Sequence, residues 1–334
     1  MKLLHIGKAE NMKRYRPDTA VAKNAEIVDM TMGYTPQEYA QAMPDAEVLI
    51  VDAIADVPGD LITRLPNLTM IHSEGVAFNR IDTKTASACG VSVCNCAGMN
   101  ASAVAEQTIL LMQGMLKNVI INDRAVREGR QIMVKEQYMA QGNLKELADC
   151  KVGLVGFGDI GSCTARLLAA YGAEVYYYKR NRLEAEEEMR YQAMYLPLDE
   201  LLHTCDIISL HLPVTKETES MCDASFFQKM KQGAYFVNTS RGELVDDEAL
   251  VCALQSGHLA MAGLDTLDNE PVQKDHPLLR QPEEVEEKLL FTPHIGGITA
   301  SSFRRGYAMI WENIERLSEG KTLLRVVNHP EREE

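Results

Sequence analysis

Short apolar runs alternate along the chain with longer segments in which apolar residues recur at every third or fourth position. The short runs are typical of buried parallel strands, and the longer segments are typical of amphipathic helices. The predicted strands are Lys2–Gly7, Val48–Val51, Met70–His72, Val91–Cys94, Val152–Gly156, Val175–Tyr178, Ile207–Leu212, Tyr235–Asn238, Met261–Leu264 and Leu289–Phe291. This alternation predicts an α/β fold built on parallel sheets.

Two of the predicted helices stand out. One long helix is predicted over Ser102–Arg130, and its most apolar part, Gln107–Leu116, falls well short of the roughly 18 residues that a membrane-spanning helix needs. We therefore interpret it as a buried helix and expect no membrane contact. The last helix ends at Gly320 and carries an apolar face made of Phe303, Tyr307, Ile310, Ile314 and Leu317.

Length and charge narrow the class of protein. The 334 residues favour two domains, because a domain takes about 150 residues. The chain has 34 Lys and Arg against 48 Asp and Glu, a formal charge of −14. An acidic chain is a poor nucleic-acid binder, because phosphate backbones attract basic patches. The opening residues, MKLLHIGKAE, do not form a signal peptide, since His5 and Lys8 interrupt the apolar run, so we expect a cytoplasmic protein.

The cysteines give little evidence for a metal site. The chain has 8 of them, and only Cys94 and Cys96 lie close together. A C-x-C pair without a second pair nearby is a weak zinc signal. Buried free thiols in a reducing cytosol explain the cysteines better, so we expect no metal.

A glycine-rich turn provides the strongest local motif. The predicted strand Val152–Gly156 runs into G-x-G-x-x-G, with Gly156, Gly158 and Gly161 as its glycines. A helix opens at Asp159 and Ile160, and a second strand follows, which completes a βαβ unit. Gly156 permits a tight turn, Gly158 admits a pyrophosphate, and Gly161 allows close packing. The motif predicts a dinucleotide site in a Rossmann domain; the alternative is a tight turn that binds nothing.

The end of the second strand bears on which dinucleotide binds. An NAD site usually has Asp or Glu there to accept from the ribose hydroxyl. This chain has Lys179, Arg180 and Arg182 instead. Cations pair well with a 2′-phosphate, so we predict a preference for NADP(H). The alternative is a solvated basic turn on a protein that uses NAD(H).

Three further strands are followed by charged residues that suit catalysis. Arg241 follows Tyr235–Asn238, Asp265 and Glu270 follow Met261–Leu264, and His294 follows Leu289–Phe291. In an open α/β sheet, ligands bind at the carboxyl ends of the strands. Taken singly, Arg241 suits a surface ion pair, Glu270 a turn and His294 a structural role. Together, behind a dinucleotide motif, they favour an active site.

With these residues in place, the chain resembles the D-isomer-specific 2-hydroxyacid dehydrogenase family. The resemblance covers almost the whole chain. The runs that carry it are Gly98–Glu106, Val152–Gly161, Phe227–Asn238, Asn238–Glu243, Gly263–Pro271 and Phe291–Gly297.

The resemblance implies a role for each site residue. Arg241 would bind the substrate carboxylate and polarise the 2-oxo group. His294 would be the acid–base, and Glu270 would hydrogen-bond it and stabilise its protonated form. Asp265 matches the position that contacts the nicotinamide carboxamide, and Thr239 belongs to the cofactor site. The backbone N–H groups of Val76 and Ala77 match the loop that receives the substrate carboxylate.

Some positions depart from the family's usual pattern. Ala77 and Asn79 stand where Gly and Asp are common, Ala103 replaces a frequent Ser or Thr, and Leu267 replaces a common aromatic residue. The catalytic residues remain, but these departures weaken any inference about which 2-oxo acid fits.

The resemblance also implies an architecture and a function. A Rossmann domain over 100–294 would be inserted into a smaller flavodoxin-like substrate domain, made of 1–99 and 295–334, with hinges near Asn100 and Ile295. The long helix and the arm after it would help to form a homodimer. We predict an NADP(H)-preferring reductase of small 2-oxo acids such as glyoxylate, hydroxypyruvate or pyruvate. The alternative is a dinucleotide-sensing, corepressor-like protein with little turnover.

Overall fold

The computed structural model describes residues 1–329. The chain divides into two compact units. Within the described residues, unit 1 is made of residues 1–100 and 298–329, and unit 2 of residues 101–297. The expected crossing points at Asn100 and Ile295 lie one residue and three residues from these boundaries.

Unit 1 is a five-stranded parallel sheet with the order β2-β1-β3-β4-β5, which is the flavodoxin-like order. Its strands are β1 (Lys2–Ile6), β2 (Glu26–Met30), β3 (Val48–Val51), β4 (Met70–Ser73) and β5 (Ser92–Cys94). Its helices are α1 (Ala9–Arg14), α2 (Ala20–Asn24), α3 (Pro36–Ala42), α4 (Gly59–Thr63), α5 (Thr83–Ala88) and α15 (Ala300–Ser318).

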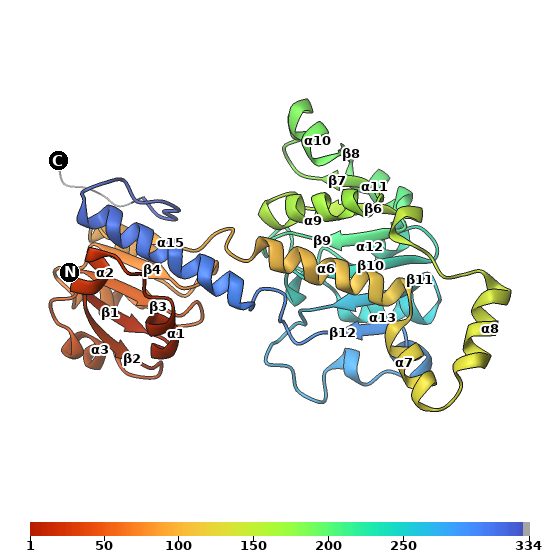
Figure 1. Ribbon diagram of the computed structural model, residues 1–334, viewed down its shortest axis with the longest axis horizontal. Helices are drawn as coiled ribbons and strands as arrows, with labels where there is room; N and C mark the ends of the chain where they lie inside the picture. Colours follow the sequence, from red (N-terminus) through yellow and green to blue (C-terminus); the bar gives the residue numbers. More distant parts are fainter. Residues whose placement is uncertain (330–334) are drawn as a thin grey trace. The chain divides into compact units, whose positions relative to one another are not determined.

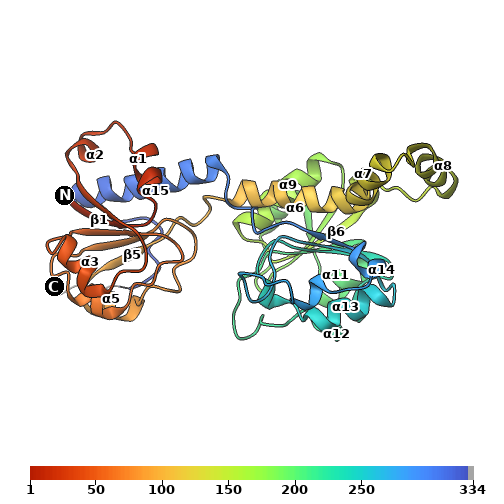
Figure 2. The ribbon, with the colours of Figure 1, turned by 90° about the horizontal axis from the view of Figure 1, so that it is seen from below.

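Both faces of this sheet are covered, which explains why its central strands are continuous apolar runs. Successive residues of a strand point to opposite faces. Leu49 and Ile71 therefore pack in one core beneath α3, α4 and α5, whereas Ile50 packs in another core against α15. Figure 2 shows α15 and α2 on one side of the sheet and α3 and α5 on the other. The apolar face predicted for the last helix is buried there, with Tyr307, Ile310 and Ile314 in the core.

Unit 2 is a seven-stranded parallel sheet with the order β12-β11-β10-β9-β6-β7-β8, which is the Rossmann order extended by one strand. Its strands are β6 (Lys151–Val155), β7 (Glu174–Tyr178), β8 (Ala193–Tyr195), β9 (Ile207–Leu210), β10 (Ala234–Asn238), β11 (Leu259–Leu264) and β12 (Leu289–Phe291). Its helices are α6 (Ala101–Leu116), α7 (Val119–Arg127), α8 (Gln131–Gln141), α9 (Asp159–Ala170), α10 (Ala185–Tyr191), α11 (Leu198–Thr204), α12 (Ala224–Lys229), α13 (Asp247–Gln255) and α14 (Glu283–Glu286). Short 3₁₀ turns lie at Leu147–Asp149, Gly242–Leu244 and Pro277–Leu279.

Helices cover both faces of this sheet as well. Helices α6 and α9 pack on one face, and α11, α12 and α13 pack on the other (Figures 1 and 2). The predicted α/β class and the Rossmann domain are thus confirmed.

The single long helix predicted over Ser102–Arg130 is wrong. The chain forms α6 and α7 instead, and Asn118 between them adopts a left-handed conformation with a φ of 48°. Asn tolerates this conformation better than most residues, so the helix can end there and restart in a new direction. The Asn118 side chain also donates to the hydroxyl of Tyr138 in α8 at 3.2 Å. This hydrogen bond connects α8 to the start of α7.

Candidate active site

The three catalytic candidates come together because their strands are neighbours. Strands β10, β11 and β12 lie side by side and run parallel, so their carboxyl ends share one edge of the sheet. Arg241, Glu270 and His294 lie in the loops that leave these ends. The sheet order thus explains how residues far apart in sequence serve one site.

His294 and Glu270 form a pair at hydrogen-bond distance. Nδ1 of His294 lies 2.6 Å from Oε2 of Glu270, and the other carboxylate oxygen accepts from the backbone N–H of Leu267 at 3.0 Å. Because an ionised carboxylate only accepts, Nδ1 is the donor. Nε2 makes no hydrogen bond to any described residue, and 43% of the side chain is exposed. This arrangement presents Nε2 as a proton donor or acceptor.

Asp265 organises the loop that carries His294. It is 2% exposed, and its carboxylate accepts from the Thr292 hydroxyl and from the backbone N–H groups of Ile295, at 3.1 Å, and Gly296, at 2.9 Å. Gln107 of α6 donates to Thr292 at 2.9 Å, which connects this loop to the helix. The sequence analysis missed Gln107 and Thr292. A signal existed, since Gln107 is a polar residue at the head of the apolar run of that helix.

Arg241 presents an uncommitted guanidinium. The side chain is exposed, and within residues 1–329 its one hydrogen bond goes from Nη1 to the carbonyl of Ser240 at 2.7 Å. The backbone beneath it is fixed, because Asn238 donates to the Arg241 carbonyl and Ser240 donates to the Leu210 carbonyl, both at 2.7 Å. A fixed backbone with a free planar fork suits recognition of a carboxylate.

A cavity of about 410 Å³ adjoins the acid–base pair. Asp265, Glu270, Thr292 and His294 contribute its polar lining. Its apolar lining comes from Leu267, Pro271, Val272, Leu279, Phe291 and Pro293. A mostly apolar concavity with a few convergent polar groups is the usual form of a small-ligand site.

The glycine turn between β6 and α9 has the geometry of a dinucleotide cradle. Gly156 has a φ of +101°, and a Cβ there would lie 2.2 Å from the His211 carbonyl oxygen. At Gly158, by contrast, a Cβ would meet nothing within 4 Å, so the backbone faces open space. Gly161 packs against the Gly156 carbonyl, where a Cβ would lie 2.6 Å away. The N–H groups of Asp159 and Ile160 lie in the first turn of α9, where helix geometry leaves them free for an anion.

Two buried polar groups at the same edge of the sheet also fit a bound dinucleotide. His211 follows β9, burial lowers its pKa to about 3, and its buried Nδ1 has no hydrogen-bond partner in the described chain. Thr239 follows β10, is 7% exposed and shares a hydrogen bond of 2.9 Å with the Thr108 hydroxyl. The residues present at this site therefore fit a dinucleotide, and His211 is a candidate that the sequence analysis missed.

The predicted phosphate-binding cations differ in their surroundings. Arg182 donates from Nε and Nη2 to the two carboxylate oxygens of Glu188, at 2.8 Å and 2.9 Å, and stacks over the ring of Tyr195. This bidentate pair counts against Arg182 as a phosphate ligand. Lys179 and Arg180 make no ion pair within residues 1–329. The sequence suggested three free cations. It did not show that Glu188, in the following helix, pairs with Arg182.

The predicted substrate loop lies in unit 1, directly after β4. The carbonyl of Val76 accepts from Asn95, and the carbonyl of Ala77 accepts from the Ser73 hydroxyl, both at 2.7 Å. The N–H groups of Val76 and Ala77 donate to no described residue, and Val76 is 39% exposed. With the two carbonyls already hydrogen-bonded, the two free N–H groups are available to donate to a carboxylate.

The cysteine pair and the other potential metal ligands do not form a metal site within the described residues. Burial raises the pKa values of Cys94 and Cys96 to about 12, so both are thiols at neutral pH. Residues 1–329 contain no group of three or more His, Cys, Asp or Glu side chains placed to hold a metal ion. The same residues form no helix that is both long and apolar enough to cross a membrane.

A Rossmann sheet with this glycine turn, and with an acid–base pair at the ends of neighbouring strands, defines a dinucleotide-dependent oxidoreductase. Residues 109–296 match the family model described as "D-isomer specific 2-hydroxyacid dehydrogenase, NAD binding domain". The chain is 31% identical to a glyoxylate reductase from Thermofilum pendens over 292 residues, which cover 87% of this chain and 84% of that protein. It is 32% identical to a hydroxypyruvate reductase from Thermotoga maritima over 294 residues, which cover 86% and 90%.

Solved structures agree with the sequence relatives. The apo form of D-mandelate dehydrogenase from Rhodotorula graminis superposes with a TM-score of 0.83 at 26% identity, covering 98% of this chain and 97% of that chain. The chain belongs to the D-isomer specific 2-hydroxyacid dehydrogenase family, as its sequence predicted. It is an enzyme that uses a nicotinamide dinucleotide and a small 2-oxo or 2-hydroxy acid.

Proposed function

We propose that this enzyme is a reductase of small 2-oxo acids, such as glyoxylate, hydroxypyruvate or pyruvate, with a preference for NADP(H). The single observation that carries the proposal is the His294–Glu270 pair, which leaves Nε2 of His294 available at the strand edge that also bears Arg241. Relatives named glyoxylate reductase and hydroxypyruvate reductase support this substrate range.

Each site residue has a chemical task in the proposed reaction. The reduced dinucleotide, when bound, supplies the hydride. In unit 2, Arg241 binds the substrate carboxylate and its fork polarises the 2-oxo group. In unit 1, the N–H groups of Val76 and Ala77 are donors for a substrate carboxylate. His294 donates the proton on Nε2 to the carbonyl oxygen. Glu270 keeps Nδ1 protonated and stabilises the positive charge of the ring before that transfer.

The preference for NADP(H) rests on Lys179 and Arg180. Strand β7 ends at Tyr178, so Lys179 stands where an NAD site usually carries its acidic residue, and Arg180 follows it. A double variant, Lys179→Ala with Arg180→Ala, is expected to lower kcat/KM for NADPH at least 10-fold and to leave that for NADH within about two-fold. Lys13→Ala, which removes an exposed cation from α1 of unit 1, is the matched control.

The test of the proposed activity is loss of the near-ultraviolet absorbance of NADPH or NADH with a panel of 2-oxo acids. Turnover with NADPH preferred supports both parts of the proposal. Turnover with NADH preferred keeps the reaction and removes the phosphate pocket. No turnover with any 2-oxo acid, when dinucleotide binding is confirmed separately, contradicts the proposed function.

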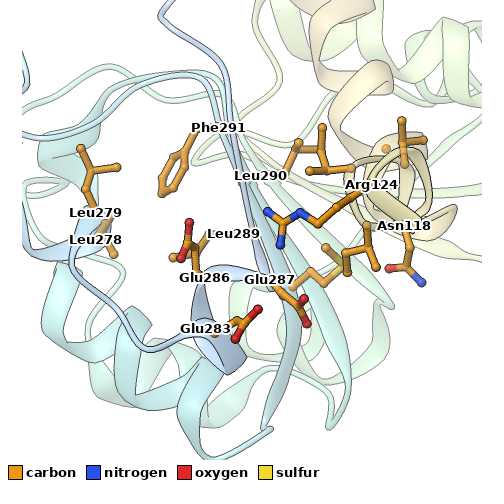
Figure 3. A pocket seen from close by; sticks show the side chains of 15 residues that line it. Asn118, Arg124, Leu278, Leu279, Glu283, Glu286, Glu287, Leu289, Leu290 and Phe291 are labelled. Carbon is orange, nitrogen blue, oxygen red and sulfur yellow. The ribbon is translucent and has the colours of Figure 1, made fainter. Parts of the chain in front are cut away.

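We also propose that a second copy of the chain covers the arm formed by α7 and α8. Helix α8 buries none of its residues. Three of its apolar residues, Ile132, Met133 and Met139, are 59%, 53% and 74% exposed. Beside α7, a cavity of about 450 Å³ is lined by Arg124 and Ile120 of that helix, by the edge strand β12, and by Glu283, Glu286 and Glu287 (Figure 3). Apolar surface of this kind in a monomer marks an interface.

Light scattering on the eluting protein tests this assembly. A dimer that dissociates in the double variant Ile132→Glu with Met139→Glu supports the proposal. The control is Glu136→Lys, which changes a charge on the same helix without adding polarity to its apolar positions. A monomer in the unmodified chain contradicts it.

A further inference from the structure

Unit 1 contains a buried charged network that the proposed reaction does not use. Nδ1 of His5, in β1, lies 2.6 Å from the Asp29 carboxylate at the end of β2. Nε2 of the same ring lies 2.9 Å from Oε1 of Glu74, and the hydroxyl of Tyr307 in α15 donates to that same oxygen. His5 and Tyr307 are buried, and Glu74 is 8% exposed.

The geometry fixes the charge of His5. Each ring nitrogen faces a carboxylate, and an ionised carboxylate only accepts hydrogen bonds, so both nitrogens donate and the ring is an imidazolium. Burial lowers the pKa of His5, but the hydrogen bonds and charges of Glu74 and Asp29 outweigh burial and raise it above 6.5. Burial and the Glu74 carboxylate also raise the pKa of Tyr307, so its hydroxyl stays a donor.

Glu74 is the residue that leads from β4 into the substrate loop. Its own N–H donates to the Val51 carbonyl at 2.7 Å, and the next residue, Gly75, has its carbonyl held by the N–H of Cys96 at 2.8 Å. Two donors on the Glu74 carboxylate and these backbone bonds therefore fix the start of the loop. The free N–H groups of Val76 and Ala77 follow within three residues.

We propose that His5, Glu74 and Tyr307 are positioning residues that aim the N–H groups of Val76 and Ala77 at the substrate carboxylate. This role rests on the proposed function. The residues act through the backbone of the loop, so they set the affinity for the 2-oxo acid and leave the dinucleotide and the proton transfer of unit 2 unchanged. The other acidic group near the network is Asp52, after β3, and its charge adds to those that raise the pKa of Tyr307.

The network also predicts a specific dependence on pH. The raised pKa of His5 means that its contribution is complete below pH 6.5 and is lost as the pH rises through the folded-state value. A neutral ring can donate from one nitrogen only, so one of its two carboxylate bonds is lost. The affinity for the substrate carboxylate should therefore fall as the pH rises and the His5 ring loses its proton.

The test uses oxamate, a non-reacting 2-oxo acid analogue, bound to the enzyme with its reduced dinucleotide. Tyr307→Phe removes one donor from Glu74 and is expected to raise the Kd of oxamate and the KM of the 2-oxo acid roughly 10-fold, with kcat and dinucleotide affinity within about two-fold. Tyr15→Phe is the matched control. Tyr15 stacks on Tyr307 with ring centroids 5.3 Å apart, but its hydroxyl makes no hydrogen bond to the described residues.

A second variant and a pH series complete the test. His5→Gln should show a raised Kd for oxamate at every pH and should lose the alkaline weakening that the unmodified enzyme shows. Thermal melting of each variant separates unfolding of unit 1 from loss of aim, and Glu74→Gln, which keeps the shape of the side chain, replaces any variant that unfolds.

The outcomes separate this inference from the proposed function. An unmodified enzyme that turns over 2-oxo acids, with the same KM in Tyr307→Phe and the same pH dependence in His5→Gln, overturns the positioning role alone. A fall in kcat without a change in KM overturns it as well. An unmodified enzyme with no turnover overturns the proposed function, and this role with it.

Discussion

Replacing Glu270 with Gln tests the acid–base pair most directly. In the structure the Glu270 carboxylate accepts two hydrogen bonds, one from Nδ1 of His294 and one from the N–H of Leu267. A glutamine side chain has one acceptor oxygen and one donor nitrogen. It can therefore satisfy only one of these two donors. If its NH₂ group faces His294, the neutral ring must carry its proton on Nε2, which is the wrong tautomer for accepting a proton.

The expected magnitude follows from the two kinds of hydrogen bond. A bond to a charged group contributes about 1.5–3 kcal/mol, against about 0.5–1.5 kcal/mol for a neutral one. Because 43% of the His294 side chain and 34% of the Glu270 side chain are exposed, the difference is taken at its low end, about 1 kcal/mol. The kcat/KM for reduction of the 2-oxo acid should therefore fall about five-fold at neutral pH.

Oxidation of the 2-hydroxy acid should suffer more, by about 10–10² in kcat, because His294 must then accept a proton on Nε2. The assay is the kcat/KM measured at neutral pH for reduction and for oxidation. Glu248→Gln, an equal change of charge on the exposed face of α13, is the control. Unchanged kcat/KM in both directions for Glu270→Gln would show that the carboxylate does not orient or support His294, and the acid–base assignment would then fail.

Three further predictions concern residues of unit 2. His294→Ala should lower kcat by about 10²–10⁴ and leave the Kd of the dinucleotide unchanged by fluorescence titration; near-normal turnover would place the acid elsewhere. Arg241→Lys should raise the KM of the 2-oxo acid at least 10-fold, because a point charge replaces a planar fork, and an unchanged KM would contradict the role of Arg241. Gly156→Ala should destabilise the protein by about 1–3 kcal/mol from backbone strain and should also abolish dinucleotide binding, since its Cβ would lie 2.2 Å from a carbonyl oxygen; denaturant unfolding measures the first effect, and a wild-type midpoint would refute it.

The sequence predicted every strand in the interior of the two sheets, and the central ones are buried on both faces. The predicted strand Val48–Val51 has the same bounds in the structure. It lies between two other strands and helices cover both of its faces, so all of its residues are apolar. The two strands that were missed, β2 and β8, are the outermost strands at their edges of the two sheets. Strand β2 keeps the polar residues Glu26 and Asp29, so its sequence resembles a loop, and β8 has only 3 residues.

The glycine turn and the acid–base pair were predictable because each depends on chemistry within a short segment or at a strand end. The pairing of Arg182 with Glu188 was not, because it depends on how the turn after β7 folds back on α10. Likewise, a charge count could not tell a free cation from one already neutralised. The break at Asn118 was hidden for a related reason, since both helices that flank it have helical periodicity and only the backbone angle shows the end of the first.

Buried carboxylates explain why the exposed site residues can work. In unit 2, Asp265 holds the loop of His294 through three donors, and in unit 1, Glu74 receives two donors at the start of the loop of Val76 and Ala77. An ionised carboxylate buried this deeply is costly unless donors surround it, so its presence requires that the loop close around it in one way. The groups proposed to meet the substrate can then remain exposed, because their loops are ordered by hydrogen bonds to a buried carboxylate.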